Sequence, residues 1–282
     1  MKQSDRRAVL IFDWDDTICP SSFVDKSKIE SFHDLPVHTQ KLFNELGKAA
    51  AKCLEAASRH GEVIIITNSD EGWVKFSAER FVPNLASVVD KYRIVSARTR
   101  YERFYPNQPL CWKAAAFAHE VNEIYETNVS KMDCDDDIND SIGSLESTDV
   151  SSDDSTSLGS YSSSKVNEII SFGDSMEERT AVRIVSGQMS ATPKSVMFIQ
   201  SPSPLEIIGQ LSMVTSHMKY VCNHESSLDL QISPEQAQQC AQLYLKKNKI
   251  QFDSCCRQEA ESIERASERA RAEPNDTVTS QA

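Results

Sequence analysis

The sequence predicts an α/β protein in which helices cover both faces of a central parallel sheet, forming a three-layer sandwich. Two kinds of segment lead to this prediction. Short apolar runs rich in β-branched residues, such as Val9–Phe12 and Val63–Ile66, are typical of strands buried on both faces. Segments between such runs place apolar residues at three- and four-residue intervals, which is typical of amphipathic helices. Alternating strands and helices favour a parallel sheet of Rossmann-like type.

Five strands are predicted, over residues 8–12, 62–66, 92–96, 166–172 and 196–199. Helices are predicted over about 38–60, from about 70 to Pro83, over 112–121 and over 207–214. Gly61 and Pro83 are expected to end the first two of these helices. A long polar helical region is predicted from about 234 to 272. In its first half Ala237, Ala241 and Tyr244 share one face, so this half is expected to pack against the rest of the protein.

The chain divides into a predicted α/β domain over residues 1–230 and a C-terminal helical extension with a polar tail over 231–282. The composition changes within the domain, at about residues 130–165. Residues 133–164 hold nine acidic side chains, many serines and no Lys or Arg. Because so few large apolar side chains cannot offset the entropy of ordering the chain, we expect a disordered surface insert. Ser151 and Ser152 precede two aspartates in this insert, which suits either phosphorylation or an unmodified solvated loop.

The composition argues against several classes of function. The formal charge of −12 over 282 residues is unfavourable for a nucleic-acid binder. No apolar run reaches the roughly 18 residues that span a bilayer, and charged residues precede the first strand where a signal peptide would be apolar. We therefore expect neither nucleic acid nor membrane as a partner. The eight cysteines contain no CxxC pair, which favours reduced thiols in a cytoplasmic or nuclear protein.

The first predicted strand runs directly into a cluster of carboxylates, Asp13-Trp14-Asp15-Asp16-Thr17. In open α/β sheets the binding site lies beyond the carboxyl ends of the strands, so this strand delivers Asp13 and Asp15 to that edge. Residues two apart in an extended chain point to the same side, and two carboxylates held that close repel unless a cation or a shared proton relieves them. A hard divalent cation such as Mg²⁺ suits carboxylate oxygens and favours substrates that carry phosphate.

The strand-DWDDT pattern resembles motif I of the haloacid dehalogenase (HAD) superfamily of phosphohydrolases. Three further motifs of that superfamily have counterparts in the expected order: Thr67-Asn68 after the second strand, Lys113 at a helix start, and the run Gly173–Glu178 after the fourth strand. The resemblance covers about residues 8–200. Neither the segment after motif I nor the segment after the third strand is long enough for a folded cap domain. The resemblance therefore implies a capless, C0-type HAD-like phosphatase.

The resemblance also implies a catalytic and metal-binding role for each acidic residue. Asp13 is the nucleophile that forms an aspartyl-phosphate, and Asp15 is the general acid and base. Mg²⁺ is held by the carboxylates of Asp13 and Asp174 and by the backbone carbonyl of Asp15. Glu178 would orient Mg²⁺-bound waters. It stands where Asp is more usual in the superfamily, and Glu177 is the alternative residue for this role.

By the same resemblance, Thr67, Asn68 and Lys113 bind the phosphoryl group. Simpler explanations remain for two of them, because Thr67 could cap the following helix and Lys113 could be a surface lysine. Asp16 occupies a position that glycine often holds in the superfamily, and we expect it to support the loop rather than to react.

Two other groups of residues are candidates for binding sites. If residues 219–224 formed a strand, Cys222 and His224 would share a face, but no fourth ligand accompanies them and His217, so a zinc site is not expected. Arg98 and Arg100 lie near the carboxyl end of the third predicted strand. They are either solvated charges at the edge of the sheet or side chains that bind an anionic substrate.

Two functions are compatible with these observations. The first is a Mg²⁺-dependent phosphatase acting on a phosphorylated substrate, such as a phosphoprotein or another large molecule that an open site admits. The alternative is a catalytically inactive HAD-like interaction module that binds a protein partner through the acidic insert or the C-terminal helix. Asp13, Asp15, Thr67 and Asp174 are all retained, which favours the enzyme.

Deletion of residues 133–164 tests the expectation for the insert. A segment that buries little apolar surface contributes little to stability, so the melting temperature of the deletion variant should stay within a few degrees of that of the full chain. Thermal unfolding followed by circular dichroism provides the measurement. A much lower melting temperature would mean that the segment packs against the domain.

Overall fold

The computed structural model describes residues 6–132 and 166–250. Over these ranges the chain forms a six-stranded parallel sheet with strand order β3-β2-β1-β4-β5-β6. The strands are β1 (Arg6–Phe12), β2 (Glu62–Thr67), β3 (Arg93–Ser96), β4 (Val166–Gly173), β5 (Thr192–Met197) and β6 (Leu228–Gln231). The predicted α/β fold with a central parallel sheet is confirmed.

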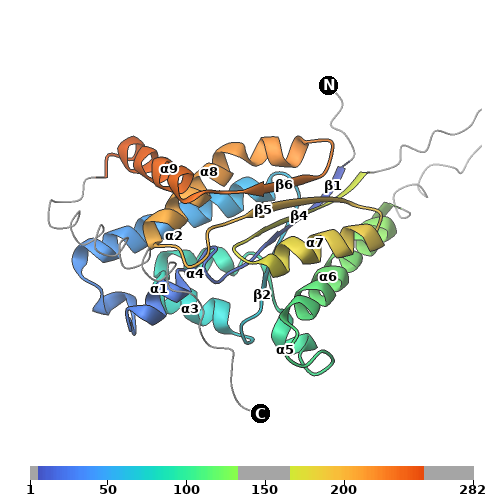
Figure 1. Cartoon of the computed structure of the whole chain (residues 1–282), viewed down its shortest axis with the longest axis horizontal. Coiled ribbons are helices and arrows are strands. Elements are labelled where there is room, and N and C mark those ends of the chain that lie inside the picture. Colours follow the sequence, from blue (N-terminus) through green and yellow to red (C-terminus); the bar gives the residue numbers. More distant parts are fainter. Residues whose placement is uncertain (1–5, 133–165, 251–282) are drawn as a thin grey trace, which may run out of the picture.

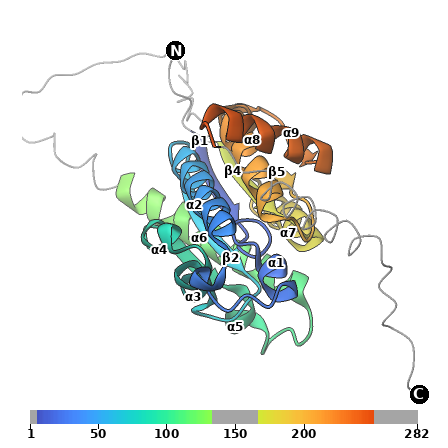
Figure 2. The same ribbon diagram turned by 90° about the vertical axis from the view of Figure 1, so that its left-hand side faces the viewer.

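Helices cover both faces of this sheet (Figure 1). The first face carries α2 (Val37–Ser58), α3 (Trp73–Phe81), α4 (Pro83–Val89) and α8 (Pro204–Asn223). The second face carries α5 (Ala97–Tyr101), α6 (Pro109–Met132) and α7 (Met176–Gln188). The short helices α1 (Ser21–Lys26) and η1 (Phe32–Asp34) connect β1 to α2. Figures 1 and 2 both show α9 (Pro234–Lys247) beside α8.

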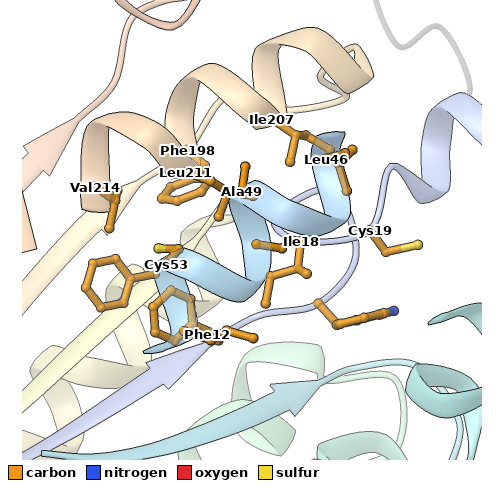
Figure 3. Close-up of a cluster of buried hydrophobic side chains, with 14 of the residues drawn as sticks. Phe12, Ile18, Cys19, Leu46, Ala49, Cys53, Phe198, Ile207, Leu211 and Val214 are labelled. Carbon is orange, nitrogen blue, oxygen red and sulfur yellow. The ribbon is translucent and has the colours of Figure 1, made fainter. Parts of the chain in front are cut away.

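Side chains of β1 alternate between two hydrophobic cores, as expected for a strand buried on both faces. Leu10 and Phe12 belong to the core under α2 and α8, whereas Val9 and Ile11 belong to the core under α6 and α7. Phe12 also stacks on Phe172 of β4, with ring centroids 4.4 Å apart. Figure 3 shows Phe12 and its neighbours packed between the sheet and the helices of the first face. The ends of β1 and β4 are thereby fixed against each other.

Several elements differ from the sequence-based expectation, among them the fifth strand, which spans Thr192–Met197 rather than residues 196–199. Pro83 ends α3 but also begins α4, because proline is well tolerated at the first position of a helix, where its missing N–H is not needed. β6 was not predicted, since it is a four-residue edge strand whose side chains are mostly exposed. Residues 219–223 lie in α8 rather than in a strand, so Cys222 and His224 do not share a strand face.

The first half of the C-terminal helical region packs as predicted. Ala237, Ala241 and Tyr244 are buried against the rest of the protein, and α9 thereby extends the layer formed by α8. The acidic insert and the region from residue 251 onward lie outside the described residues. None of the helices in the described ranges is both long and apolar enough to cross a membrane.

The contact between α8 and α9 depends on Gly209. A Cβ atom added there would lie 2.0 Å from the carbonyl oxygen of Ala237, so no larger residue fits without moving α9. Gly209→Ala should therefore lower the free energy of unfolding by about 1–3 kcal/mol, as expected for overpacking. In α7, a Cβ at Gly187 would meet no atom within 4 Å, and Gly187→Ala should leave stability unchanged or raise it by about 0.5–1 kcal/mol. Denaturant unfolding of both variants measures the difference, and equal effects would contradict the close contact.

Candidate functional site

The candidate site lies at the point where the strand order of the sheet reverses. From β1 the sheet grows through β2 to β3 on one side, and through β4 to β5 and β6 on the other. In open parallel sheets, ligands bind in the crevice beyond the carboxyl ends of the two strands at such a point. Asp13 directly follows β1 and Asp174 directly follows β4. The Asp13 N–H donates a 2.8 Å hydrogen bond to the carbonyl of Phe172, which fixes the two strand ends side by side.

Lys113 reaches the same crevice from the first turns of α6. Its Nζ lies 2.6 Å from Asp13 Oδ1 and 2.6 Å from Glu178 Oε1, and it donates a 2.8 Å hydrogen bond to the carbonyl of Ile66 at the end of β2. Only 1% of the residue is exposed, so Lys113 is a buried cation and not a surface lysine. A single side chain thus links β1, β2, α6 and α7.

The acidic residues of the site are crowded and poorly solvated. Burial raises the pKa of Asp13 to about 7, with Lys113 acting against the shift and Glu178 adding to it. Burial and the nearby charge of Asp13 raise the pKa of Asp174 to about 8. For Glu178, burial would raise the pKa, but the attraction of Lys113 outweighs it and the pKa is lowered. The pKa of Lys113 is raised because its two carboxylate partners outweigh its own burial.

The carboxylates of this cluster outnumber its cationic side chain, so a bound cation would balance the excess negative charge. The Asp174 carboxylate accepts a long hydrogen bond of 3.5 Å from the Thr17 hydroxyl and a second one from its own backbone N–H, and no cationic side chain in the described ranges pairs with it. In the described ranges Lys113 is the one cationic side chain that pairs with Asp13, and the pKa of Asp13 is still raised, by burial first and then by the charges of Glu178 and Asp15. Carboxylate oxygens are the donors that a hard divalent cation prefers. Asp13 and Asp174 are therefore the residues that could hold Mg²⁺.

The carboxylate of Glu178 shares Lys113 with Asp13 but has further partners of its own. Oε1 pairs with Lys113, and Oε2 accepts hydrogen bonds from the backbone N–H and the hydroxyl of Ser175, which form a capping box at the start of α7. Glu177 is partly exposed, and its N–H donates to the Ser175 hydroxyl. A role for either glutamate toward metal-bound water stays a prediction.

Asp15 accepts four hydrogen bonds from side chains on three segments. Oδ1 accepts from the Ser21 hydroxyl and from the Trp73 indole N–H at 2.7 Å. Oδ2 accepts from the hydroxyls of Thr67 at 3.1 Å and Ser69 at 2.7 Å. Three of these four donors, Ser21, Ser69 and Trp73, were not predicted from the sequence. The Thr-x-Ser spacing at the end of β2 places the hydroxyl of Ser69 near that of Thr67 and could have indicated Ser69. The sequence around Trp73 indicates only a helix residue that faces the core.

The other predicted residues lie at the same edge of the sheet but have different partners. Asn68 Nδ2 donates a 3.5 Å hydrogen bond to the carbonyl of Pro109, and no hydrogen bond in the described part of the chain joins Asn68 to the carboxylates. Asp16 has a positive φ of 55°, and its carboxylate accepts a 2.9 Å hydrogen bond from the N–H of Ser22, so it supports the loop after β1. Arg98 pairs with Glu102, 3.0 Å away, and Arg100 pairs with Glu120, 2.7 Å away.

A second cluster of metal-ligand types lies away from the crevice. His119, Glu120 and Glu123 of α6 each bring a donor atom within 4.8 Å of the others. Glu120 is fully buried and is paired with the guanidinium groups of Arg93 and Arg100, and Glu123 is paired with Arg93 as well. The cluster is therefore a network of ion pairs that ties β3 and α5 to α6.

Comparisons with models of known protein families, with curated proteins and with solved structures found no match. The chemistry of the site depends on its own residues. They comprise two carboxylates that flank the crevice between β1 and β4, a buried lysine that contacts one of them, and a third carboxylate held by four donors.

The burial and crowding of Asp13 and Asp174 predict a pH dependence of stability in the absence of divalent cations. Both pKa values are raised from 3.8 in the folded chain, so the folded chain binds protons more tightly than the unfolded chain does. The free energy of unfolding should therefore rise as the pH falls from about 8 toward about 5. Asp174→Asn removes one of the two charges and should raise the melting temperature at pH 8 and flatten the profile.

Asp229 provides the matched control for this prediction. Arg179 lowers the pKa of Asp229, which is the opposite of the shift at Asp174. Asp229→Asn removes a favourable pair and should not raise the melting temperature at pH 8. Differential scanning calorimetry with a chelator present gives both values. A lower melting temperature for Asp174→Asn at pH 8 would contradict the crowding of charge.

Proposed function

We propose that the protein is a Mg²⁺-dependent phosphatase that hydrolyses phosphomonoesters through an aspartyl-phosphate on Asp13. The observation that carries the proposal is the position of Asp13 at the end of β1, where it contacts the buried cation Lys113 and lies beside the strand end that carries Asp174. A phosphate dianion repels an anionic nucleophile unless positive charge is supplied first. The resemblance of the four sequence motifs to those of the HAD superfamily supports the same assignment.

Each residue has a distinct task in this reaction. Asp13 Oδ attacks phosphorus, the bond from phosphorus to the leaving oxygen breaks, and that oxygen takes a proton from Asp15. In the second step a water attacks the phosphorus, Asp15 takes the proton of that water, and the bond to Asp13 breaks to release phosphate. Lys113 and the Thr67 hydroxyl stabilise the charge on the phosphoryl oxygens. Mg²⁺ held by Asp13 and Asp174 would supply further positive charge to these oxygens and favour the ionised form of Asp13.

The connections beyond the carboxyl ends of the strands bear on the class of substrate. Within the described residues, the connection from β1 to α2 consists of α1, η1 and short loops, and the connection from β3 to α6 contains only α5 and a short loop. Neither connection forms a separate domain over the carboxyl ends of the strands. This favours a phosphate carried by a large molecule such as a phosphoprotein, because the site needs no lid to open.

Two variants distinguish the proposed mechanism from a protein that only binds partners. Asp13→Asn removes the nucleophile and should abolish turnover of p-nitrophenyl phosphate. Asp15→Asn keeps the nucleophile but loses the base, whose contribution is typically about 10²–10⁴-fold, so an aspartyl-phosphate should accumulate. The label should be stable in acid, labile to hydroxylamine and absent from the double variant.

Asp25→Asn changes an exposed aspartate on α1 and serves as the control that should keep wild-type turnover. Turnover by the wild type should require Mg²⁺ and disappear with a chelator. If Asp13→Asn retains Mg²⁺-dependent turnover, the covalent mechanism is wrong. If the wild type neither binds Mg²⁺ nor hydrolyses any phosphopeptide or phosphometabolite in a broad panel, the alternative of a non-catalytic interaction module replaces the proposal.

A further inference from the structure

The hydrogen bonding of Asp15 leaves no room for another donor. A carboxylate offers about four lone-pair positions, and each oxygen of Asp15 already accepts two hydrogen bonds. A group that takes a proton from water must accept a hydrogen bond from that water first. One of the four present donors therefore has to leave before Asp15 can act as a base.

Thr67 is the donor whose departure the geometry favours. Its hydrogen bond to Asp15 is 3.1 Å long, whereas those of Ser69 and Trp73 are both 2.7 Å. Thr67 is also the residue whose hydroxyl is assigned to the phosphoryl group in the proposed function. When that hydroxyl turns to a phosphoryl oxygen, Asp15 Oδ2 regains one acceptor position, which a water can occupy.

Trp73 is held firmly enough to keep Asp15 in place during this exchange. It is the first residue of α3, and its carbonyl accepts a 2.7 Å hydrogen bond from the Ser77 hydroxyl. The same Ser77 oxygen accepts a 2.8 Å hydrogen bond from the indole N–H of Trp14. The segment from Trp14 to Asp15 is thus attached to α3 at two points, through Trp14 to Ser77 and through Asp15 to Trp73.

We infer that Trp73 is a positioning residue of the proposed phosphatase: its indole N–H keeps the Asp15 carboxylate oriented while the Thr67 hydroxyl leaves it for the phosphoryl group. The inference rests on the proposed function. The step that depends on Trp73 is hydrolysis of the aspartyl-phosphate, in which Asp15 takes a proton from water as the oxygen of that water bonds to phosphorus. The bond between phosphorus and Asp13 then breaks, and Asp13 regains its carboxylate.

Trp73→Phe tests the inference because it keeps an aromatic ring but removes the N–H. With Mg²⁺ and p-nitrophenyl phosphate, the first step needs little help from Asp15, since nitrophenolate is a good leaving group. The burst of nitrophenolate should therefore keep its rate within about twofold. Steady-state turnover should fall about tenfold, the loss expected for one hydrogen bond to a charged group, and the phosphorylated fraction of the enzyme should rise. A role in folding alone would lower both rates together.

Trp112→Phe is the matched control. The indole N–H of Trp112 donates to the backbone carbonyl of Tyr105, so its removal should leave both rates unchanged. If Trp73→Phe folds poorly, the contact of Trp73 with Asp15 is tested without that variant, through the signal of the indole N–H.

A measurement that needs no turnover separates failure of the inference from failure of the proposed function. The three tryptophans give three indole N–H signals in an NMR spectrum of the nitrogen-labelled chain. Asp15→Asn should shift the Trp73 signal and leave that of Trp112 in place. If the Trp73 signal does not move, the inference is wrong. It is also wrong if Trp73→Phe slows the burst as much as it slows steady-state turnover. A wild type without any turnover overturns the proposed function, and the inference with it.

Discussion

The contact of one buried ammonium group with two carboxylates is the interaction on which the rest of the site depends. Lys113 compensates Asp13 and Glu178 at once and also binds the end of β2 through the carbonyl of Ile66. A charge without a partner would be very costly at this depth, and removal of one member of a buried pair typically costs about 3–5 kcal/mol. The crevice can therefore hold several acids only because α6 begins where it does and places a cation beneath them.

Glu178 joins the start of α7 to the buried lysine. One carboxylate oxygen completes the capping box at the start of α7, and the other pairs with Lys113. The N-terminus of α7 is thereby fixed next to Asp174, which directly follows β4. Under the proposed function, acids fixed in this way favour binding of Mg²⁺, because little conformational entropy is lost when the cation binds.

Much of the fold and part of the site were predictable from the sequence. Runs such as Val63–Ile66 predict buried strands, and acids directly after strands predict a site at the carboxyl edge of the sheet, because both signals are local. β6 could not be predicted, since an exposed edge strand lacks the alternation on which such a prediction depends. The contact of Trp73 with Asp15 joins residues 58 positions apart and exists only after α3 has packed. Residue type and spacing carry no information about such a contact.

The place at which the acidic insert joins the fold has a consequence for any partner that binds it. α6 begins at the carboxyl edge of the sheet, beside the crevice, and ends at Met132, while β4 begins at Val166 on the amino edge (Figure 1). The eight residues of β4 separate that attachment from the crevice by about 26 Å, at about 3.3 Å per residue. Under the proposed function, a phosphoprotein recruited near the attachment points would present its phosphate to the crevice only through a tether of at least that length. The length of such a tether would then set the effective concentration of the phosphate at Asp13, and two substrates with the same phosphorylated sequence could differ in rate through spacing alone.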